Sequence, residues 1–304
     1  MLHDQAHTLT FIGFGEAAQA FVSRMDRSGL DTVRAFDLKV MGEQRADVMA
    51  TCAAYDVECC DDLPTALKGA DIVWSVVTAD QAYPAALEVA ELIQAGAFFL
   101  DCNSCAPHTK QAADQVITEA GAHYVDVAVM SPVLPARNKT PMLLSGEYST
   151  VAQTLLTQLN MNATVEPGPV GTASAIKMVR SIMVKGMEAL FAECTLAGRL
   201  AGVDQQVFAS LEASTPGYHW AKRAGYNLER MTLHGERRAA EMEEVCAFLD
   251  HLGIPEKLSA TTVRWQRRLA ESGVKAREDD YATAADELLD AFALKPYERP
   301  VIKP

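Results

Sequence analysis

The first half of the chain alternates short apolar segments rich in β-branched residues with longer segments whose apolar residues recur at helical spacing. Such alternation is typical of a mostly parallel sheet covered by helices on both faces. Two clear helical segments are Glu16–Met25 and Gln81–Ile93. The predicted strands are Leu9–Ile12, Val33–Phe36, Ile72–Val77, Ala97–Leu100, Tyr124–Val129, Met142–Leu144 and Ala163–Val165.

The β-type alternation ends at the segment Glu166–Gly171, whose sequence EPGPVG breaks regular structure. We therefore expect an α/β domain over residues 1–168 and an all-helical domain over residues 169–304, joined by a long interdomain helix. The proline-rich segment Met130–Pro141 is predicted to be a loop, and residues from about Lys295 an extended tail. The helices predicted in the second domain are Ala173–Gly202, Gln205–Glu212, Glu236–Leu252 and Ser259–Glu271.

Composition narrows the function classes. The chain has 304 residues, 49% of them hydrophobic, and a formal net charge of -13, which disfavours binding to a nucleic-acid backbone. It has neither an apolar stretch of roughly 20 residues, the length a bilayer span requires, nor a signal-peptide pattern at its start, so we expect a cytoplasmic protein without a membrane partner.

Seven cysteines, an odd number, fit a reducing compartment. Cys102 and Cys105 form a C-x-x-C pair followed by His108, which raises a redox or zinc site as one interpretation. No second ligand pair accompanies them at zinc spacing, so we favour buried apolar cysteines and expect no metal.

The segment LTFIGFGEAAQAF has the G-x-G-x-x-G/A pattern between a strand and a helix, with Gly13, Gly15 and Ala18 at its fixed positions. The first glycine permits a tight turn, the second lets the backbone approach a pyrophosphate, and the small third residue lets the helix pack on the strand. This indicates a Rossmann-type, doubly wound domain that binds a dinucleotide. The predicted cofactor contacts at this turn are Gly13, Phe14, Gly15, Glu16 and Ala17.

Asp37 ends the second predicted strand about twenty residues after the glycines, where a carboxylate accepts hydrogen bonds from ribose hydroxyls. This favours NAD, although Arg34 and Lys39 nearby make NADP the alternative. Val77 and Thr78, at the end of the next strand, are also predicted to contact the cofactor.

A further polar cluster, DCNSCAP, follows the strand that ends at Leu100. Polar residues at the carboxyl end of a parallel strand lie where α/β sheets bind ligands, so Asn103 is predicted to contact the cofactor and Ser104 the substrate. Alternatively, the segment is only a turn initiated by Asn and Ser.

The segment GTASAIKMVRSIMVKG places Lys177 and Ser181 on one helix face, with Arg180 beside them. A lysine whose ammonium is partly desolvated exchanges protons more easily near neutral pH, so Lys177 is a candidate general acid/base. A solvated surface lysine is the alternative.

Together, the segments GFGEAA, DCNSCAP, DVAVMSPV, TPMLLSG and GTASAIK occur in the order and approximate spacing of the β-hydroxyacid dehydrogenases. This family includes 3-hydroxyisobutyrate and 6-phosphogluconate dehydrogenases. The later segment HGERRAAEMEEV resembles the helical domain of a 6-phosphogluconate dehydrogenase-like branch. The resemblance extends to about residue 270.

The resemblance implies an NAD(P)-dependent hydroxyacid dehydrogenase that forms a homodimer. Lys177 matches the catalytic lysine of the family and Ser104 a hydroxyl residue that contacts substrate. Two departures lie around the substrate: the usual Ser-Gly-Gly is Met130-Ser131-Pro132, and the usual asparagine four residues after the lysine is Ser181. We therefore predict Lys177, Ser104 and Ser181 as catalytic residues. The predicted substrate contacts are Ser104, Met130, Ser131, Lys177, Arg180 and Ser181.

Two other functions remain as alternatives. An imine or carbonyl reductase shares this two-domain plan but usually has aspartate or tyrosine in place of the lysine. A non-catalytic dinucleotide sensor is the second alternative, because function depends on sites and not on folds. The arginine pairs Arg237–Arg238 and Arg267–Arg268 are interpreted as solvated helix faces with ion pairs, the alternative being an anion clamp.

Overall fold

The computed structural model describes residues 7–294, and the tail predicted from Lys295 lies outside them. The chain divides into two compact units, residues 1–178 and 179–304. Helix α7 (Thr172–Ala201) begins in the first unit and ends in the second. The functional division expected between residues 168 and 169 stays a prediction.

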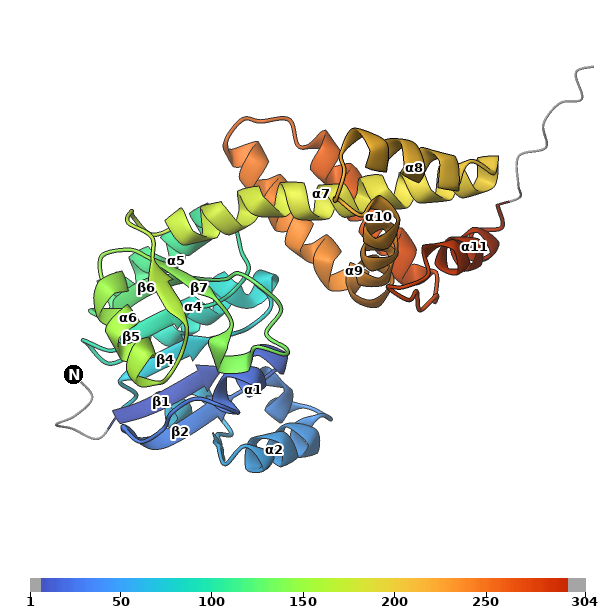
Figure 1. Ribbon diagram of the computed structural model, residues 1–304. Helices are drawn as coiled ribbons and strands as arrows, with labels where there is room; N and C mark the ends of the chain where they lie inside the picture. Colours follow the sequence, from blue (N-terminus) through green and yellow to red (C-terminus); the bar gives the residue numbers. More distant parts are fainter. Residues whose placement is uncertain (1–6, 295–304) are drawn as a thin grey trace, which may run out of the picture. The chain divides into compact units, whose positions relative to one another are not determined.

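An eight-stranded sheet forms the centre of the first unit, in the order β3-β2-β1-β4-β5-β6-β7-β8 (Figure 1). All neighbouring strands are parallel except β6 and β7. The seven predicted strands are confirmed, whereas β3 has only two residues and was not predicted. The strands are β1 (His7–Ile12), β2 (Leu30–Phe36), β3 (Glu58–Cys59), β4 (Ile72–Ser75), β5 (Phe98–Asp101), β6 (His123–Val129), β7 (Met142–Ser145) and β8 (Ala163–Val165).

Helices cover both faces of this sheet. Successive residues of a strand point to opposite faces, so the apolar strands of this sheet present side chains on both faces that the helices bury. In β4, Trp74 packs with Phe21 of α1 in one apolar core, and Val73 packs with Val89 of α4 in the other. The predicted α/β class is thereby confirmed. The helices of this unit, apart from α7, are α1 (Glu16–Val22), α2 (Arg45–Ala54), α3 (Leu63–Leu67), α4 (Ala82–Ala90), α5 (Pro107–Glu119) and α6 (Ser149–Gln158), with short 3-10 turns η1 (Leu38–Met41), η2 (Ala79–Gln81) and η3 (Arg137–Lys139).

The second unit is helical throughout its described elements. Its helices, after α7, are α8 (Asp204–Ser214), α9 (Trp220–His251), α10 (Lys257–Glu271) and α11 (Tyr281–Ala291). Leu228 and Met231 of α9 form its core with Leu269 of α10 and Leu288 of α11. None of the helices within residues 7–294 combines the length and apolar character that a bilayer span needs.

The predicted start of the helix Glu236–Leu252 is wrong, since α9 begins sixteen residues earlier, at Trp220. Gly235 lies inside this helix, and glycine is a poor helix former. A Cβ atom at Gly235 would lie 2.3 Å from the carbonyl oxygen of Gln266 on α10, so close packing of two backbones requires glycine here. Tertiary packing thus overrides the local signal.

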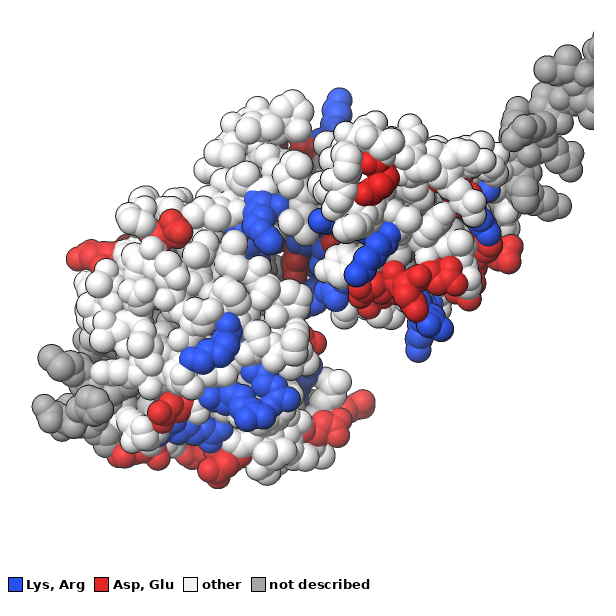
Figure 2. Space-filling view, in the orientation of Figure 1, with Lys and Arg blue, Asp and Glu red and all other residues white. Residues whose placement is uncertain are grey.

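Charged side chains of both signs are interspersed on the face of the molecule in Figure 2. Arg267 of α10 and Glu243 of α9 form an ion pair between solvent-exposed side chains, with 2.7 Å between nitrogen and oxygen. This confirms the solvated-face interpretation for Arg267.

Candidate active site

The glycine turn lies between β1 and α1, at the point where the strand order changes direction between β1 and β4. Gly13 has a φ of +85°, and a Cβ atom there would lie 2.6 Å from the carbonyl oxygen of Val76. The turn therefore requires glycine at this position. A Cβ atom at Gly15 would meet nothing within 4 Å, so the backbone at the start of α1 is open to a phosphate group.

Asp37 is fixed at the end of β2 by two main-chain hydrogen bonds. The Phe14 amide donates to its Oδ2 (2.9 Å) and the Lys39 amide to its Oδ1 (3.0 Å). The carboxylate is thus attached to the glycine turn itself. Each oxygen retains a lone pair for a further donor, such as a ribose hydroxyl.

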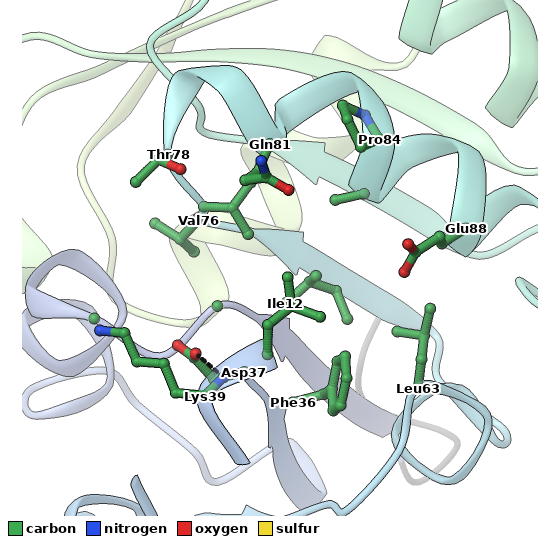
Figure 3. Close-up of a pocket in the computed structure, with 15 residues that line it drawn as sticks. Ile12, Phe36, Asp37, Lys39, Leu63, Val76, Thr78, Gln81, Pro84 and Glu88 are labelled. Atoms are coloured by element: carbon green, nitrogen blue, oxygen red, sulfur yellow. Dashed lines mark hydrogen bonds between the residues drawn. The ribbon is translucent and has the colours of Figure 1, made fainter. Parts of the chain in front are cut away.

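A cavity of about 340 Å³ opens beside the glycine turn and Asp37 (Figure 3). Its size falls in the range of small-molecule sites. Five of the predicted cofactor residues line it: Gly13, Gly15, Asp37, Val77 and Thr78. The other four do not line it: Phe14, Glu16, Ala17 and Asn103. The Phe14 amide does, however, donate a hydrogen bond to Asp37, which lines the cavity. The residues present fit a dinucleotide, with a ribose near Asp37 and a phosphate near Gly15.

Asn103 connects two strand ends beside this cavity. Its side-chain oxygen accepts a hydrogen bond from the Val77 amide (2.7 Å), and its nitrogen donates to Ser75 Oγ (2.9 Å). The Asn103 amide nitrogen in turn donates to Asp101 Oδ1 (3.0 Å). Asn103 therefore braces the loop after β4 that lines this cavity.

Lys177 and Ser104 meet in the first unit. The Lys177 Nζ donates a hydrogen bond to Ser104 Oγ, although 73 residues separate them in sequence. Both side chains are half-buried. Ser104 follows β5, the strand next to β4, so the contact lies at the same edge of the sheet as the ends that border the cavity.

A buried lysine lies beneath this loop. Lys110 of α5 is 0% exposed, and its Nζ donates to the main-chain oxygen of Asp101 (2.6 Å) and approaches Asp101 Oδ1 (2.9 Å) and Asp126 Oδ1 (3.6 Å). Burial lowers the pKa of Lys110, but the charges of Asp101, Cys105 and Asp126 raise it by more, and the net pKa lies above the usual value. Lys110 is therefore a buried cation.

Asp126 connects this cation to the start of α7. Its Oδ2 accepts hydrogen bonds from the main-chain amides of Gly171 and Ser174, both 3.1 Å, and its Oδ1 accepts one from Ser174 Oγ (2.6 Å). Ser145 Oγ also donates to Oδ2 (3.0 Å). Otherwise unpaired amides at a helix start favour a negative charge. The segment that carries Lys177 is thus anchored one turn before the lysine.

Two predicted residues of the substrate site belong to the second unit. Arg180 is exposed, and Ser181 is buried and accepts a hydrogen bond from Lys185 Nζ (3.2 Å). Lys185 also pairs with Glu241 (2.8 Å). In the first unit, Ser131 is exposed and Met130 is half-buried after β6.

The surroundings of Arg238 differ from those predicted from the sequence. Arg237 is exposed as expected, but Arg238 is only 9% exposed and forms a two-point ion pair with Glu188 of α7. Gln266 Nε2 donates to the same carboxylate (2.8 Å). Helical spacing alone did not show that α7 and α10 cover this face of α9. Both the solvated face and the anion clamp are wrong for Arg238, because Glu188 occupies its guanidinium.

The C-x-x-C pair is buried. Cys102 Sγ accepts a hydrogen bond from Trp74 Nε1 (2.6 Å), and burial raises the pKa of Cys102 to about 12, which disfavours the reactive thiolate. Within residues 7–294, no three His, Cys, Asp or Glu side chains gather as they would around a metal ion.

Sequence reasoning missed Lys110 and Asp126, although each left a signal. Lys110 occupies the apolar stripe of α5 that includes Ala113 and Ile117. Asp126 interrupts an apolar strand in the sequence YVDVAV. A charge at a position that the periodicity assigns to the core indicates a buried partner of opposite charge.

The chain matches two family models. Residues 8–165 match the NAD binding domain of 6-phosphogluconate dehydrogenase, and residues 199–269 match a domain of unknown function, DUF1932. The first match spans more than half of the chain and includes the glycine turn, Asp37 and Ser104.

Solved structures agree with this match. A conserved hypothetical protein from Sinorhizobium meliloti 1021 is 30% identical over 95% of this chain and 98% of its own, with a TM-score of 0.78. A conserved protein of unknown function, described as structurally similar to 3-hydroxyacid dehydrogenases, is 26% identical over 94% of this chain and 98% of its own, with a TM-score of 0.70.

More distant structures share the fold. A 3-hydroxyisobutyrate dehydrogenase from Mycobacterium tuberculosis, studied with L-serine, is 15% identical over 93% of this chain and 99% of its own (TM-score 0.72). An imine reductase from Myxococcus stipitatus, in complex with NAD+, is 19% identical (TM-score 0.58). The chain belongs to the β-hydroxyacid dehydrogenase family, and its first unit is the family's NAD-binding domain.

Proposed function

We propose that this protein transfers hydride between a nicotinamide cofactor and a small hydroxyacid of the β-hydroxyacid or aldonate type. The observation that carries the proposal is the hydrogen bond from Lys177 Nζ to Ser104 Oγ, which brings an amine and a hydroxyl together at the strand ends next to the dinucleotide cavity. This pairing supports Lys177 as the general acid/base, in agreement with the family resemblance.

Gly13, Gly15 and Asp37 would hold a nicotinamide dinucleotide in the cavity, and this cofactor would supply the hydride chemistry at the carbinol carbon of the substrate. Lys177, in its neutral form, takes the proton of the substrate hydroxyl during oxidation, and the ammonium returns it during reduction. Ser104 holds the Lys177 side chain in place through their hydrogen bond. Because the lysine is half-buried, the proton passes between two defined atoms with limited competition from water.

The substrate carboxylate requires hydrogen-bond donors. We assign Ser104 and Ser131 hydroxyls and the Arg180 guanidinium to this role, since arginine binds a carboxylate through two parallel hydrogen bonds. Ser181 and Met130 complete the proposed substrate contacts. Ser181 accepts from Lys185 in this structure and has its own hydroxyl proton to donate.

The cofactor preference follows from Asp37. Its carboxylate is fixed toward the cavity by Phe14 and Lys39 amides, where it accepts hydrogen bonds from ribose hydroxyls and repels a 2′-phosphate. We therefore propose NAD as the preferred form. The Lys39 side chain, which also lines the cavity, is the feature that favours some NADP binding.

A homodimer is the proposed assembly. Val179, Met183 and Leu190 of α7 are 53%, 64% and 61% exposed, and such large apolar side chains on one helix favour burial against a partner. A second copy would cover them with its own helices. The cytoplasmic location remains a prediction from the sequence.

The test is a substrate panel. The purified protein is incubated with small hydroxyacids and aldonates and with NAD or NADP, and reduced cofactor is followed by its absorbance. We expect turnover with at least one hydroxyacid, faster with NAD. Turnover of imines alone would favour an imine reductase. An imine reductase in complex with NAD+ is among the solved structures that share this fold. Cofactor binding without turnover of any hydroxyacid, carbonyl compound or imine would favour the sensor.

A further inference from the structure

The cofactor cavity contains a second carboxylate besides Asp37. Glu88 lines the cavity from α4 and lies across the labelled side chain of Ile12 from Asp37 (Figure 3). Its carboxylate points into the cavity near Leu63. Among the described residues, none forms a hydrogen bond or ion pair with it, so its oxygens are available to a ligand.

The position of Glu88 relates to one part of the cofactor. Gly15 and Asp37 fix where the pyrophosphate and the adenosine ribose lie, so the base must extend into the remaining part of the cavity. That part is lined by the apolar residues Phe36, Leu63 and Ala85, which we call the apolar slot. An apolar lining of this kind suits an aromatic base. The base would enter this slot and approach α4.

Glu88 lies at the edge of that slot. Pro84 and Glu88 are four residues apart on α4 and therefore share one helix face, which is the face that lines the cavity. The adenine ring carries an N6 amino group, which donates hydrogen bonds, at its edge. A carboxylate accepts hydrogen bonds and donates none when ionised.

We propose that Glu88 recognises the adenine base by accepting a hydrogen bond from its N6 amino group, and so selects adenine over 6-oxopurine dinucleotides. A 6-oxopurine carries a carbonyl oxygen in place of the amino group. This oxygen and the Glu88 carboxylate both accept hydrogen bonds, so neither can donate one to the other. A site with a fixed hydrogen-bonding group rejects a ligand that lacks the matching partner.

The experiment compares two reduced cofactors in direct binding, by fluorescence titration of the wild-type protein and three variants. The probes are NADH and its deamino form, nicotinamide hypoxanthine dinucleotide. Because Glu88 is exposed and its hydrogen bond competes with water, we expect the wild type to prefer NADH by only about fivefold to tenfold. In Glu88→Gln and Glu88→Ala, this preference falls to less than about twofold, since glutamine offers both an acceptor and a donor and alanine offers neither.

Glu91 supplies the matched control. It is exposed, lies next to the end of α4 and does not line the cavity, so Glu91→Gln removes the same charge without touching the slot. Glu91→Gln should keep the wild-type preference. If Glu88→Gln also kept it, or if the wild type bound both cofactors equally, the proposed recognition would be wrong. An equal gain in affinity for both cofactors in Glu88→Gln would also overturn it, because that result indicates charge repulsion only.

This inference rests on the NAD-binding domain and not on the hydroxyacid reaction. The measurement involves cofactor binding alone, so its failure would leave the proposed hydroxyacid chemistry intact. Failure of the substrate panel would, conversely, leave the role of Glu88 standing.

Discussion

The first unit buries Lys110 between Asp101 and Asp126, and the second buries Arg238 against Glu188. The two networks differ in what else their carboxylates bind. Asp101 and Asp126 accept hydrogen bonds from main-chain amides of the loop that carries Ser104 and of the start of α7. Glu188 instead accepts from side chains of α9 and α10.

This difference assigns the two networks different tasks. A carboxylate that binds main-chain amides fixes the course of the backbone, and in the first unit that backbone carries both Ser104 and Lys177. A carboxylate that binds side chains of neighbouring helices fixes how those helices pack. We therefore expect damage to the first network to alter the site, and damage to the second to alter stability alone.

The largest effect is expected for Lys110→Met. The change leaves two carboxylates buried without their cation and should lower the free energy of unfolding by about 3–5 kcal/mol in urea titrations. It should also weaken NADH binding severalfold, because Asp101 supports Asn103 and thereby the Val77 amide beside the cavity. Unchanged NADH affinity in a folded variant would contradict the proposed task of this network.

The Lys110 effect has a defined pH dependence. Its pKa is raised in the folded protein, so its stabilisation is fully present below the unfolded value of about 10.4 and is lost as pH rises through the folded pKa. The stability difference between wild type and Lys110→Met should be constant from pH 7 to about 10 and shrink above about 10.4. A difference that shrinks already below pH 9 would point to another group.

Arg238→Met should lower the free energy of unfolding somewhat less than Lys110→Met does. Glu188 loses its ion pair but keeps the hydrogen bond from Gln266, so the expected loss is about 3 kcal/mol, at the lower end of the range for a broken buried pair. NADH affinity, measured by fluorescence, should equal that of the wild type. A severalfold loss of NADH affinity here would remove the distinction between the two networks.

Ser174→Ala tests the smallest contribution. The variant loses the hydrogen bond from Ser174 Oγ to Asp126 but keeps the main-chain bond, and should lose about 1 kcal/mol of unfolding free energy. Thr172→Ala is the matched control, because its hydroxyl donates to the Pro169 carbonyl oxygen and not to a carboxylate. We expect a smaller loss in the control, and equal losses would show that Asp126 adds nothing at this helix start.

Much of the fold could be predicted from the sequence, because the strands and the glycine turn each have a local sequence signal. Strands such as β4 and β5 are continuous apolar segments, and the glycine turn has a fixed spacing. The start of α9 did not follow, since Gly235 is a helix breaker in isolation and only its contact with the α10 backbone explains it.

Some residues of the candidate site could also be predicted from the sequence, because Gly13, Asp37 and Ser104 belong to short motifs. The partners of Lys110 and Arg238 come from segments 9 to 50 residues away, and periodicity cannot state which buried charges meet. Glu88 belongs to no motif and could only be identified from the lining of the cavity.

The acid/base role of Lys177 is tested most directly by Lys177→Arg. Arginine keeps the positive charge and a donor for Ser104, but its guanidinium has a pKa far above that of lysine and therefore stays protonated, so it cannot take a proton. On a hydroxyacid found in the substrate panel, the account predicts a fall in kcat of about 100-fold to 10,000-fold with NADH affinity unchanged. A variant that retained the wild-type kcat across the pH range would contradict the assignment of Lys177.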